Sequence, residues 1–278
     1  MHNPISFFAA LCVAAPLASA GTVVFSNNFD STIPSEVSPG VALITPVQFF
    51  AGLGPNGYQF GGSFLRSPTG NTVTITLNNL PAHTTLSVDF LFAAIDSLDG
   101  TGTFPEGDFL NVKLDGVSIF RESFANATST QDQTYVAPPG GLLARRVDLG
   151  FTGPGSFYTD SAYDMSVDPR FHNLAHTAST ATITFVMEGP GIQDLGDESW
   201  AMDNLRISVN AAACVGDLNS DNQVDDADFQ IFVVAYDILD CADASMPAGC
   251  PADLNADGFV DDLDFQLFAV AYDQLLCS

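Results

Sequence analysis

The chain has 278 residues, of which 33 are Asp or Glu and 7 are Lys or Arg, so its formal net charge at pH 7 is −26. Hydrophobic residues make up 46% of the chain and charged residues 14%, a composition that is too apolar for a disordered acidic chain and predicts a buried core. So negative a charge repels phosphate groups, which argues against nucleic acids and anionic membranes as partners.

Residues 1–20 have the pattern of a secretory signal peptide. The apolar run 5–17 precedes Ala18-Ser19-Ala20, a small-residue motif that predicts cleavage after Ala20. A buried first helix is the alternative. No later run approaches the roughly 20 apolar residues that cross a bilayer, so we expect a secreted, soluble, extracellular protein.

Residues 21–210 are expected to form one β-rich domain. Apolar and polar residues alternate there in short runs, separated by turns rich in Gly, Pro and Asn. The clearest runs are 22–25, 72–77, 85–92, 109–114, 182–187 and 205–209. They predict a mostly β fold, an antiparallel β-sandwich of the jelly-roll type, and no helical periodicity is visible before residue 226.

The composition changes abruptly near residue 210. Residues 211–278 contain 14 Asp and no Glu, Lys or Arg, so they carry −14 of the total charge of −26 and leave −12 for the first 210 residues. We therefore place a domain boundary here and expect residues 211–278 to form a small all-α module.

The C-terminal module is a tandem duplication. Residues 217–241 and 253–277 align at an offset of 36 with 17 identities in 25 positions. Each copy begins with a loop that has oxygen-bearing side chains at positions 1, 3, 5, 9 and 12 and a backbone carbonyl at position 7, as the oxygen shell of Ca²⁺ requires. The predicted ligands are Asp217, Asn219, Asp221, Gln223, Asp225 and Asp228 in loop 1, and Asp253, Asn255, Asp257, Phe259, Asp261 and Asp264 in loop 2.

Other loop positions and the segments that follow fit the same interpretation. Position 6 needs a sharp turn, which Gly258 satisfies directly and Asn222 less well, and Val224 and Val260 are expected to pack inward. A helix follows each loop. Its expected apolar face consists of Phe229, Phe232, Val233 and Tyr236 in the first copy, and Phe265, Phe268 and Tyr272 in the second. A solvated acidic surface is the alternative, but it does not explain the repeated spacing, so we predict two Ca²⁺ ions whose binding is coupled to folding.

The last 65 residues resemble a type I dockerin domain, a duplicated loop–helix module related to the EF-hand. The resemblance covers both loops and both helices. It implies docking to a cohesin domain of a scaffold or cell-surface protein, usually to gather polysaccharide-degrading enzymes. Partner contacts in the family come largely from loop positions 10 and 11 and the following helix. Those positions here are Asp226-Ala227 and Asp262-Leu263 in place of the frequent hydroxyl pair, and the helices lack the family's basic residues.

Apart from Cys12, the cysteines all lie in the module, and their even number predicts disulfides in an exported protein. A helix of about ten residues spans roughly 15 Å, which disfavours a bridge within one copy. Antiparallel packing of the copies places the start of each beside the end of the other. We therefore predict Cys214–Cys277 and Cys241–Cys250.

The larger domain carries two distinctive acidic segments, 95–120 and 196–205. The second contains Glu198, Trp200 and Asp203. Together the segments resemble secreted bacterial β-sandwich domains of lectin-like or galactose-binding-like type, whose last strand often begins with an acidic-x-Trp-x-x-Asp-Asn pattern. By analogy of fold alone, the resemblance implies a polysaccharide ligand.

The candidate site residues of this domain each have two interpretations. Trp200 is either a sugar-stacking platform or, as the following strand favours, a core residue. His172 and His176 either form a metal pair or are ordinary loop residues. Six acids either share a further, structural Ca²⁺ or cap turns at strand ends: Asp96, Asp99, Asp108, Asp197, Glu198 and Asp203.

Glycoside hydrolysis needs two carboxyl groups facing each other across a cleft, roughly 5–9 Å apart. Glu106 with Asp108, or Asp197 with Glu198, are candidate pairs, but near neighbours on a chain give no evidence of such a cleft, so no catalytic residue is assigned. The favoured function is a secreted calcium-binding protein whose dockerin-like module attaches a non-catalytic, carbohydrate-associated sandwich to a partner. A glycoside hydrolase or polysaccharide lyase on the same scaffold and a structural exoprotein are the alternatives.

Overall fold

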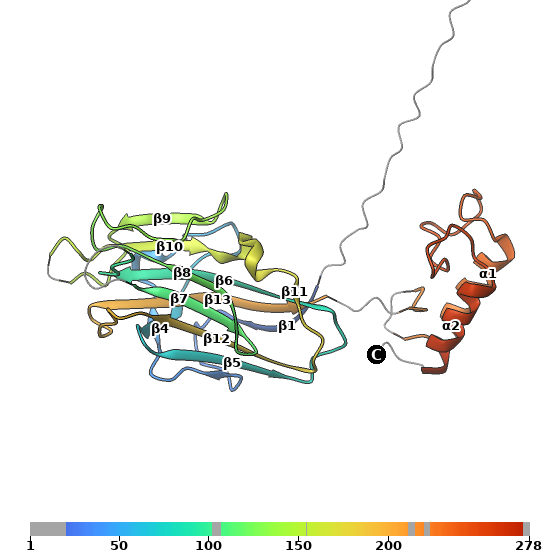
Figure 1. The fold of residues 1–278 in the computed structure, drawn as a ribbon, viewed down its shortest axis with the longest axis horizontal. Helices are drawn as coiled ribbons and strands as arrows, with labels where there is room; N and C mark the ends of the chain where they lie inside the picture. The colour runs from blue at the N-terminus through green and yellow to red at the C-terminus, as the bar shows by residue number, and fades with distance from the viewer. Residues whose placement is uncertain (1–20, 102–106, 154, 211–214, 220–222, 275–278) are drawn as a thin grey trace, which may run out of the picture.

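The computed structural model describes residues 21–101, 107–153, 155–210, 215–219 and 223–274. The predicted signal peptide lies outside this range. The described residues form two antiparallel sheets followed by two α-helices, which confirms the predicted fold class (Figure 1). None of the helices in these ranges is long and apolar enough to cross a membrane.

The larger sheet has eight strands, with the two longest at its centre. Its main path runs in the order β3 (Leu43–Pro46), β4 (Ser63–Pro68), β13 (Glu198–Val209), β6 (Thr85–Asp96), β10 (Asp160–Asp164) and β9 (Leu142–Val147). Two further strands pair alongside, β1 (Thr22–Asn27) with β13 and β11 (Leu174–Ala175) with β6.

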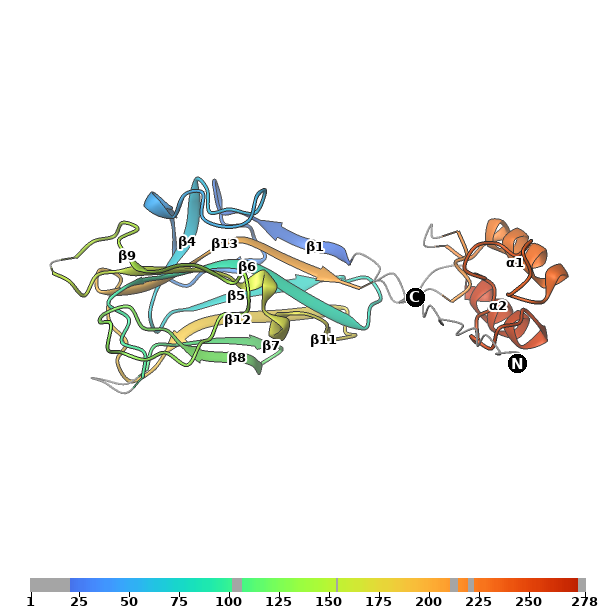
Figure 2. The same cartoon turned by 90° about the horizontal axis from the view of Figure 1, so that it is seen from above.

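The smaller sheet has five strands and forms the second layer (Figure 2). Their order is β2 (Val37–Ser38), β5 (Thr72–Asn78), β12 (Thr180–Glu188), β7 (Phe109–Leu114) and β8 (Val117–Ser123). Alternation fixes the register: Val73 of β5 lies opposite Phe185 of β12, Ile75 lies opposite Ile183, and all four are fully buried.

The main core lies between the sheets, and a second one covers part of the outer face of the larger sheet. In β6, Val88, Phe90 and Phe92 belong to the main core. Leu91 and Ala93 point the other way, into a cluster with Phe50, Phe60 and Phe64. Phe50 lies in the 3₁₀-helix η1 (Gln48–Phe50). Burial on both faces makes the end of β6 a dry environment for any charged group placed there.

All six predicted runs are strands, although β6 is longer than predicted and β13 begins earlier. The structure adds strands that simple alternation did not predict: β2, β3, β4, β8, β9, β10 and β11. Two further 3₁₀-helices, η2 (Met165–Val167) and η3 (Pro169–Phe171), follow β10.

The C-terminal module contains α1 (Asp226–Ile238) and α2 (Asp262–Gln274), and it has a hydrophobic cluster of its own. Val224 and Val260 are buried in this cluster, as predicted, together with Phe232 and Phe268. The expected apolar face was partly wrong, because three of its members are largely exposed: Phe229 (41%), Val233 (46%) and Phe265 (45%). The buried face of α1 instead contains Ala235.

Candidate metal centres

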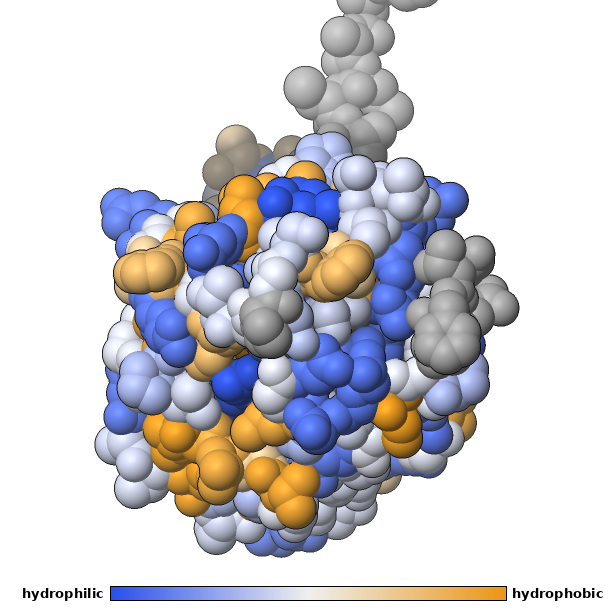
Figure 3. Space-filling view, turned by 90° about the vertical axis from the view of Figure 1, so that its left-hand side faces the viewer, coloured by the Kyte–Doolittle hydropathy of each residue, from blue (hydrophilic) through white to orange (hydrophobic). Residues whose placement is uncertain are grey.

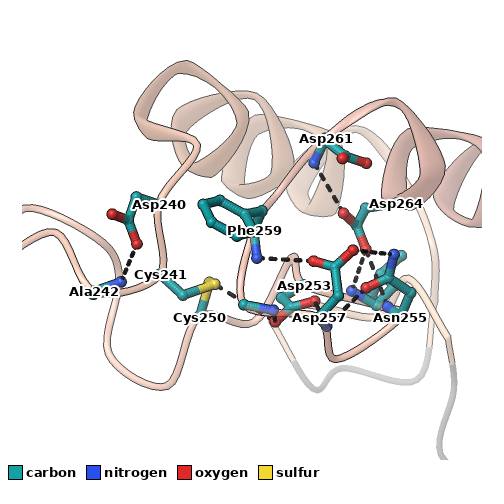
Figure 4. Close-up of a disulfide and its surroundings, with 12 residues drawn as sticks. Asp240, Cys241, Ala242, Cys250, Asp253, Asn255, Asp257, Phe259, Asp261 and Asp264 are labelled. Atoms are coloured by element: carbon teal, nitrogen blue, oxygen red, sulfur yellow. Dashed lines mark hydrogen bonds between the residues drawn. A yellow bond between two sulfur atoms is a disulfide. The ribbon is translucent and has the colours of Figure 1, made fainter.

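Loop 2 runs from Asp253 to Asp264 and is described in full (Figure 4). Asp253 Oδ1 accepts a hydrogen bond from Asp257 N (3.1 Å), and its Oδ2 accepts one from Gly258 N (2.9 Å). Gly258 has φ of +94°, the left-handed backbone that the sharp turn at position 6 was predicted to need. Asn255 Oδ1 also accepts from Asp257 N, at 2.9 Å. The oxygens predicted at positions 1, 3 and 5 therefore belong to one tightly folded turn.

The acid at position 12 ties each loop to the helix that follows. Asp264 is fully buried; its Oδ1 accepts from Leu254 N (2.8 Å) and Asn255 N (3.0 Å), and its Oδ2 from Asp261 N (2.9 Å). Asp228 occupies the same place in loop 1 and accepts from Leu218 N at 2.7 Å, Asn219 N at 3.0 Å and Asp225 N at 3.0 Å. The duplication in sequence is thus a duplication of hydrogen bonds.

Position 9 is also the N-cap of the helix. Asp225 Oδ1 accepts from Ala227 N (2.8 Å), and Asp261 Oδ1 accepts from Leu263 N (2.8 Å). A carboxylate at an N-cap satisfies N–H groups that the helix leaves without partners, which is the local reason that α1 and α2 begin here. Of the predicted ligands, Asp221 lies outside the described residues, as does Asn222 at position 6.

The chemistry of both loops is that of oxygen donors, which suits a hard cation such as Ca²⁺. The structure does not gather the acids of loop 2 around one point, since no three of its described carboxylates come within 4.8 Å of one another. Backbone N–H groups hold them instead. Asp257 Oδ1, for example, accepts from Phe259 N at 3.0 Å.

The two copies of the module pack head to tail, as predicted. Tyr236 OH, near the end of α1, donates to Asp262 Oδ1 at the start of α2 (2.5 Å), and Tyr272 OH donates in turn to Asp226 Oδ1. Phe232 stacks on Phe268 with a ring-centroid distance of 4.9 Å.

A disulfide joins the copies beside loop 2. The predicted bridge Cys241–Cys250 is present, with a Cα–Cα distance of 5.4 Å, and Cys241 Sγ lies 3.6 Å from Asp253 Oδ2 (Figure 4). The bridge therefore anchors the chain where loop 2 begins. The other predicted bridge, Cys214–Cys277, lies outside the described residues.

In the sandwich, three of the six candidate acids converge. Asp99 follows β6, Asp108 precedes β7 and Glu198 begins β13, and each contributes one oxygen to a group whose members all lie within 4.8 Å of one another. Asp108 and Glu198 are completely buried. Burial and the negative charge of neighbouring acids raise the pKa of both carboxyl groups.

The other three candidate acids have different partners, and burial places two of them in a similar dry environment. Burial raises the pKa of Asp96 to about 8 although Arg66 Nη2 lies 3.3 Å away, and it raises that of Asp203 to about 7. Their contacts are Asp96 with Arg66, Asp197 with Ser97 and Tyr158, and Asp203 with Gly61 N and Asn204 N. Of these three, only Asp203 accepts from backbone N–H groups, as the turn-capping alternative expected, whereas Asp96 and Asp197 accept from side chains.

Neither predicted carboxyl pair forms a catalytic cleft in the described residues. Glu106 lies outside them. Asp197 and Glu198 are sequence neighbours with different partners: Asp197 Oδ1 accepts from Tyr158 OH (2.8 Å), whereas Glu198 Oε1 accepts from Gln193 Nε2 (3.0 Å). The carboxyl pair that does meet, Asp108 with Glu198, was not predicted as a pair, and both residues are completely buried.

The two candidate histidines, His172 and His176, have different partners. His172 Nε2 contacts Ser166 O (2.7 Å), whereas His176 Nδ1 contacts His83 Nε2 (2.7 Å) and its Nε2 lies 3.1 Å from Asp115 Oδ2. His83 is far from His176 in sequence, so no local pattern links them.

Trp200 is a core residue. Its side chain is fully buried and packs on Phe92 and Phe185 with ring-centroid distances of 6.4 and 6.5 Å. This confirms the favoured interpretation and removes the sugar platform. Trp200 lies two residues after Glu198 on β13.

A polar groove of about 300 Å³ lies on the outer face of the larger sheet. Ser87 and Asp89 of β6 and Arg206 of β13 line it, with His172 and Asn173 at its side. Arg206 donates to Asp89 Oδ2 through Nε (2.9 Å) and Nη2 (2.7 Å), and Arg206 remains 51% exposed. The groove therefore offers charged and hydroxyl groups to solvent, a surface that suits a hydroxyl-rich ligand.

No family model matches the sequence, and no curated protein matches it. Among solved structures, the K1 adhesin domain of Lys-gingipain from Porphyromonas gingivalis W83 is similar with 10% identity, over 68% of this chain and 99% of that one, at a TM-score of 0.35. The family 35 carbohydrate-binding module from Clostridium thermocellum is similar with 10% identity, over 67% of this chain and 99% of that one, at a TM-score of 0.27.

A larger protein is also similar. The family GH115 4-O-methyl-α-glucuronidase with specificity for decorated arabinogalactans has 15% identity over 75% of this chain, at a TM-score of 0.32. This chain spans only 20% of that enzyme. Identities and TM-scores this low carry no inference about what the present chain binds or catalyses.

Proposed function

We propose that this is an exported calcium-binding protein in which a dockerin-like module attaches a non-catalytic, carbohydrate-associated β-sandwich to a partner protein. The observation that carries the proposal is the duplicated loop, in which a buried Asp228 or Asp264 links an acidic turn to the start of a helix by the same three backbone hydrogen bonds.

Charge supports the assignment of Ca²⁺ to these loops. The module contains 14 Asp and no Lys or Arg, so its loop carboxylates repel one another without a basic side chain of the module to offset the repulsion. A cation that enters each loop relieves this repulsion, and the binding free energy then stabilises the module.

The surface of the module supports a protein partner. Ala227, at loop position 11, lines a groove of about 540 Å³ together with Ile231 and Val234 of α1 and two prolines, Pro247 and Pro251. Val234 is 54% exposed, and its counterpart Val270 is 63% exposed. An apolar groove on a module that contains 14 Asp and no Lys or Arg fits a partner that offers apolar and basic side chains, and a cohesin-like domain is the proposed partner.

In this proposal, the sandwich is the part of the protein that the module attaches to the partner. The polar groove at Asp89 and Arg206 supports a polysaccharide ligand, since the side chains that line it can donate hydrogen bonds to the hydroxyl groups of a sugar and accept hydrogen bonds from them. The complete burial of Asp108 and Glu198 supports a binding role over hydrolysis, because a glycosidic bond would have to reach both carboxyl groups.

Calcium titration of the full chain tests the proposal. Helical circular dichroism reports the module, since the α-helices described all lie there. We expect it to rise on calcium addition and saturate with two ions in the loops. Asp217→Ala and Asp253→Ala should each remove one of them, whereas Asp237→Asn, an exposed acid of α1 outside the loops, should not. A helical signal that is already complete in chelator and does not respond to calcium would contradict the proposal.

A further inference from the structure

The three converging acids of the sandwich come from both layers. Asp99 follows β6 and Glu198 begins β13, two strands of the larger sheet, and Asp108 precedes β7 of the smaller one. Figure 3 faces the end of the sandwich where β6 ends and β13 begins, and hydrophilic residues cover much of it. The acids therefore meet where the two sheets approach each other.

Two oxygens in this group have no donor. Asp108 Oδ2 accepts from Asp99 N (2.5 Å) and Glu198 Oε1 accepts from Gln193 Nε2 (3.0 Å), but Asp108 Oδ1 and Glu198 Oε2 accept from no N–H or O–H group of the described residues. Both side chains are 0% exposed. Leaving a buried carboxylate oxygen without a partner is strongly unfavourable.

The arginines described at this end of the sandwich do not supply the missing charge. Arg66 pairs with Asp96. Arg145 and Arg146 both donate to Ala125 O, and Arg146 also donates to Gln131 O. Gln131 Nε2 donates to Asp99 Oδ1 (2.6 Å), so it orients that carboxylate without neutralising it.

We propose that Asp99, Asp108 and Glu198 bind a divalent cation, which joins the two sheets at this end of the sandwich. The donors are oxygens from three separate segments, the set that Ca²⁺ prefers and that Zn²⁺, which favours nitrogen and sulfur, does not. Gln131 is a positioning residue for Asp99. This site is separate from the two loops of the module and does not depend on the function proposed for them.

A proton shared between Asp108 and Glu198 is the competing explanation of the same geometry. The two carboxyl groups face each other, so one proton between them would satisfy both unpartnered oxygens. If a cation is the explanation, the site binds metal ions. If a shared proton is the explanation, it does not.

Terbium luminescence of the full chain separates them. Tb³⁺ occupies calcium sites, and a nearby indole sensitises its emission. Trp200 is the only tryptophan of the chain, and it lies two residues from Glu198, roughly 7 Å along the strand. Excitation at the red edge of tryptophan absorption therefore reports Tb³⁺ bound close to Trp200, and residues 211–278 contain no tryptophan of their own.

We expect saturable sensitised emission that Ca²⁺ displaces. Glu198→Gln and Asp108→Asn should each weaken Tb³⁺ binding by at least about ten-fold. Asp197→Asn replaces a neighbouring acid, and the amide oxygen can still accept from Ser97 and Tyr158. This variant should leave the affinity for Tb³⁺ unchanged. Asp99→Asn, at a less buried position, provides a second ligand variant if the buried substitutions prevent folding.

Absence of sensitised emission from the folded wild-type chain would overturn the proposal in favour of the shared proton. Equal Tb³⁺ affinity in the wild type and in all three folded ligand variants would overturn it as well.

Discussion

The sandwich and the C-terminal module hold their aspartates in opposite ways. In the module, Asp228 and Asp264 accept hydrogen bonds from backbone N–H groups within their own loops, at the start of a helix. In the sandwich, Asp108 and Glu198 are buried at strand ends and Asp203 is buried within β13, and burial raises the pKa of each. The module stabilises its charge by local turns, whereas the sandwich brings charge together by tertiary packing and must offset the cost of burying it.

The largest expected effect concerns the core of the sandwich. Trp200→Ala removes a fully buried indole that packs on Phe92 and Phe185, and we expect a loss of about 3–5 kcal/mol in the free energy of unfolding. Denaturant unfolding followed by β-type circular dichroism measures it. Phe49→Ala is the control, because Phe49 is 72% exposed and should change stability by at most about 0.5 kcal/mol. A loss no larger than that of the control would mean that Trp200 is not the core residue described.

The same substitution should leave the module unchanged. The buried clusters of the two regions share no residue, so the calcium-dependent helical signal is expected to persist in Trp200→Ala. Loss of that signal would show that the module depends on the sandwich for folding, and the comparison between two self-contained regions would fail.

The next effect concerns the disulfide of the module. Replacing Cys241 and Cys250 together by Ser opens a bridge with a sequence separation of 9. In the chain-entropy model this costs about 2–3 kcal/mol. Thermal unfolding of the helices in the presence of calcium measures the loss. The sandwich transition is the internal control and should not move. Because the bridge lies beside Asp253, loop 2 should also bind calcium more weakly in this variant than in the wild type.

The pH dependence of stability should differ between the regions. Burial raises the pKa of Asp203 to about 7, far above the unfolded value of about 3.9. Between these values the native state holds a proton that the unfolded state has lost, so stability falls as pH rises from about 4 to about 7. With chelator present, the sandwich should therefore unfold more easily at neutral than at mildly acidic pH.

Asp203→Asn tests the origin of this trend. The amide cannot ionise but can still accept a bond from Gly61 N, so the variant should show a shallower fall in stability with pH. Asp132→Asn, which replaces an acid exposed to solvent, should keep the wild-type slope. An unchanged slope in Asp203→Asn would assign the effect to other buried acids, with Asp96 the first to test, since burial raises its pKa to about 8.

The contrast between the regions also explains what the sequence could predict. The loops, both helices and the pairing of Cys241 with Cys250 follow from local spacing and from an internal repeat, so they were predictable. The strands with clean alternation, such as β5 and β12, were predictable for the same reason. Which side of α1 is exposed could not be predicted. The repeat places Phe229 and Val233 on an apolar stripe, but it does not show which part of that stripe other residues cover.

Other strands could not be predicted from the sequence, because tertiary packing buries polar residues that are not typical of buried strands. β10 reads Asp-Ser-Ala-Tyr-Asp and is buried throughout, since Asp160 accepts bonds from Leu149 N and Asp96 N. β9 contains Arg145 and Arg146 in succession, beside an irregular register. The cluster of Asp99, Asp108 and Glu198 is the extreme case, because its members are up to 99 positions apart and only the completed sandwich unites them.

The smallest expected effect on stability concerns the surface of the module. Val234→Ser changes a side chain that is 54% exposed and lines the groove beside Ala227, so the free energy of unfolding should change by at most about 0.5 kcal/mol. Affinity for a purified cohesin domain, measured by calorimetry in calcium, should nevertheless fall by about ten-fold, since that change needs only about 1.4 kcal/mol of lost contact. Val270→Ser, its counterpart in α2, is the matched variant. A ten-fold loss in Val234→Ser alone would place the partner on the first copy, and equal losses would place it across both. If neither variant weakens a complex that forms in the wild type, the apolar groove is not the docking surface, and the acidic loops themselves would then be the next surface to test.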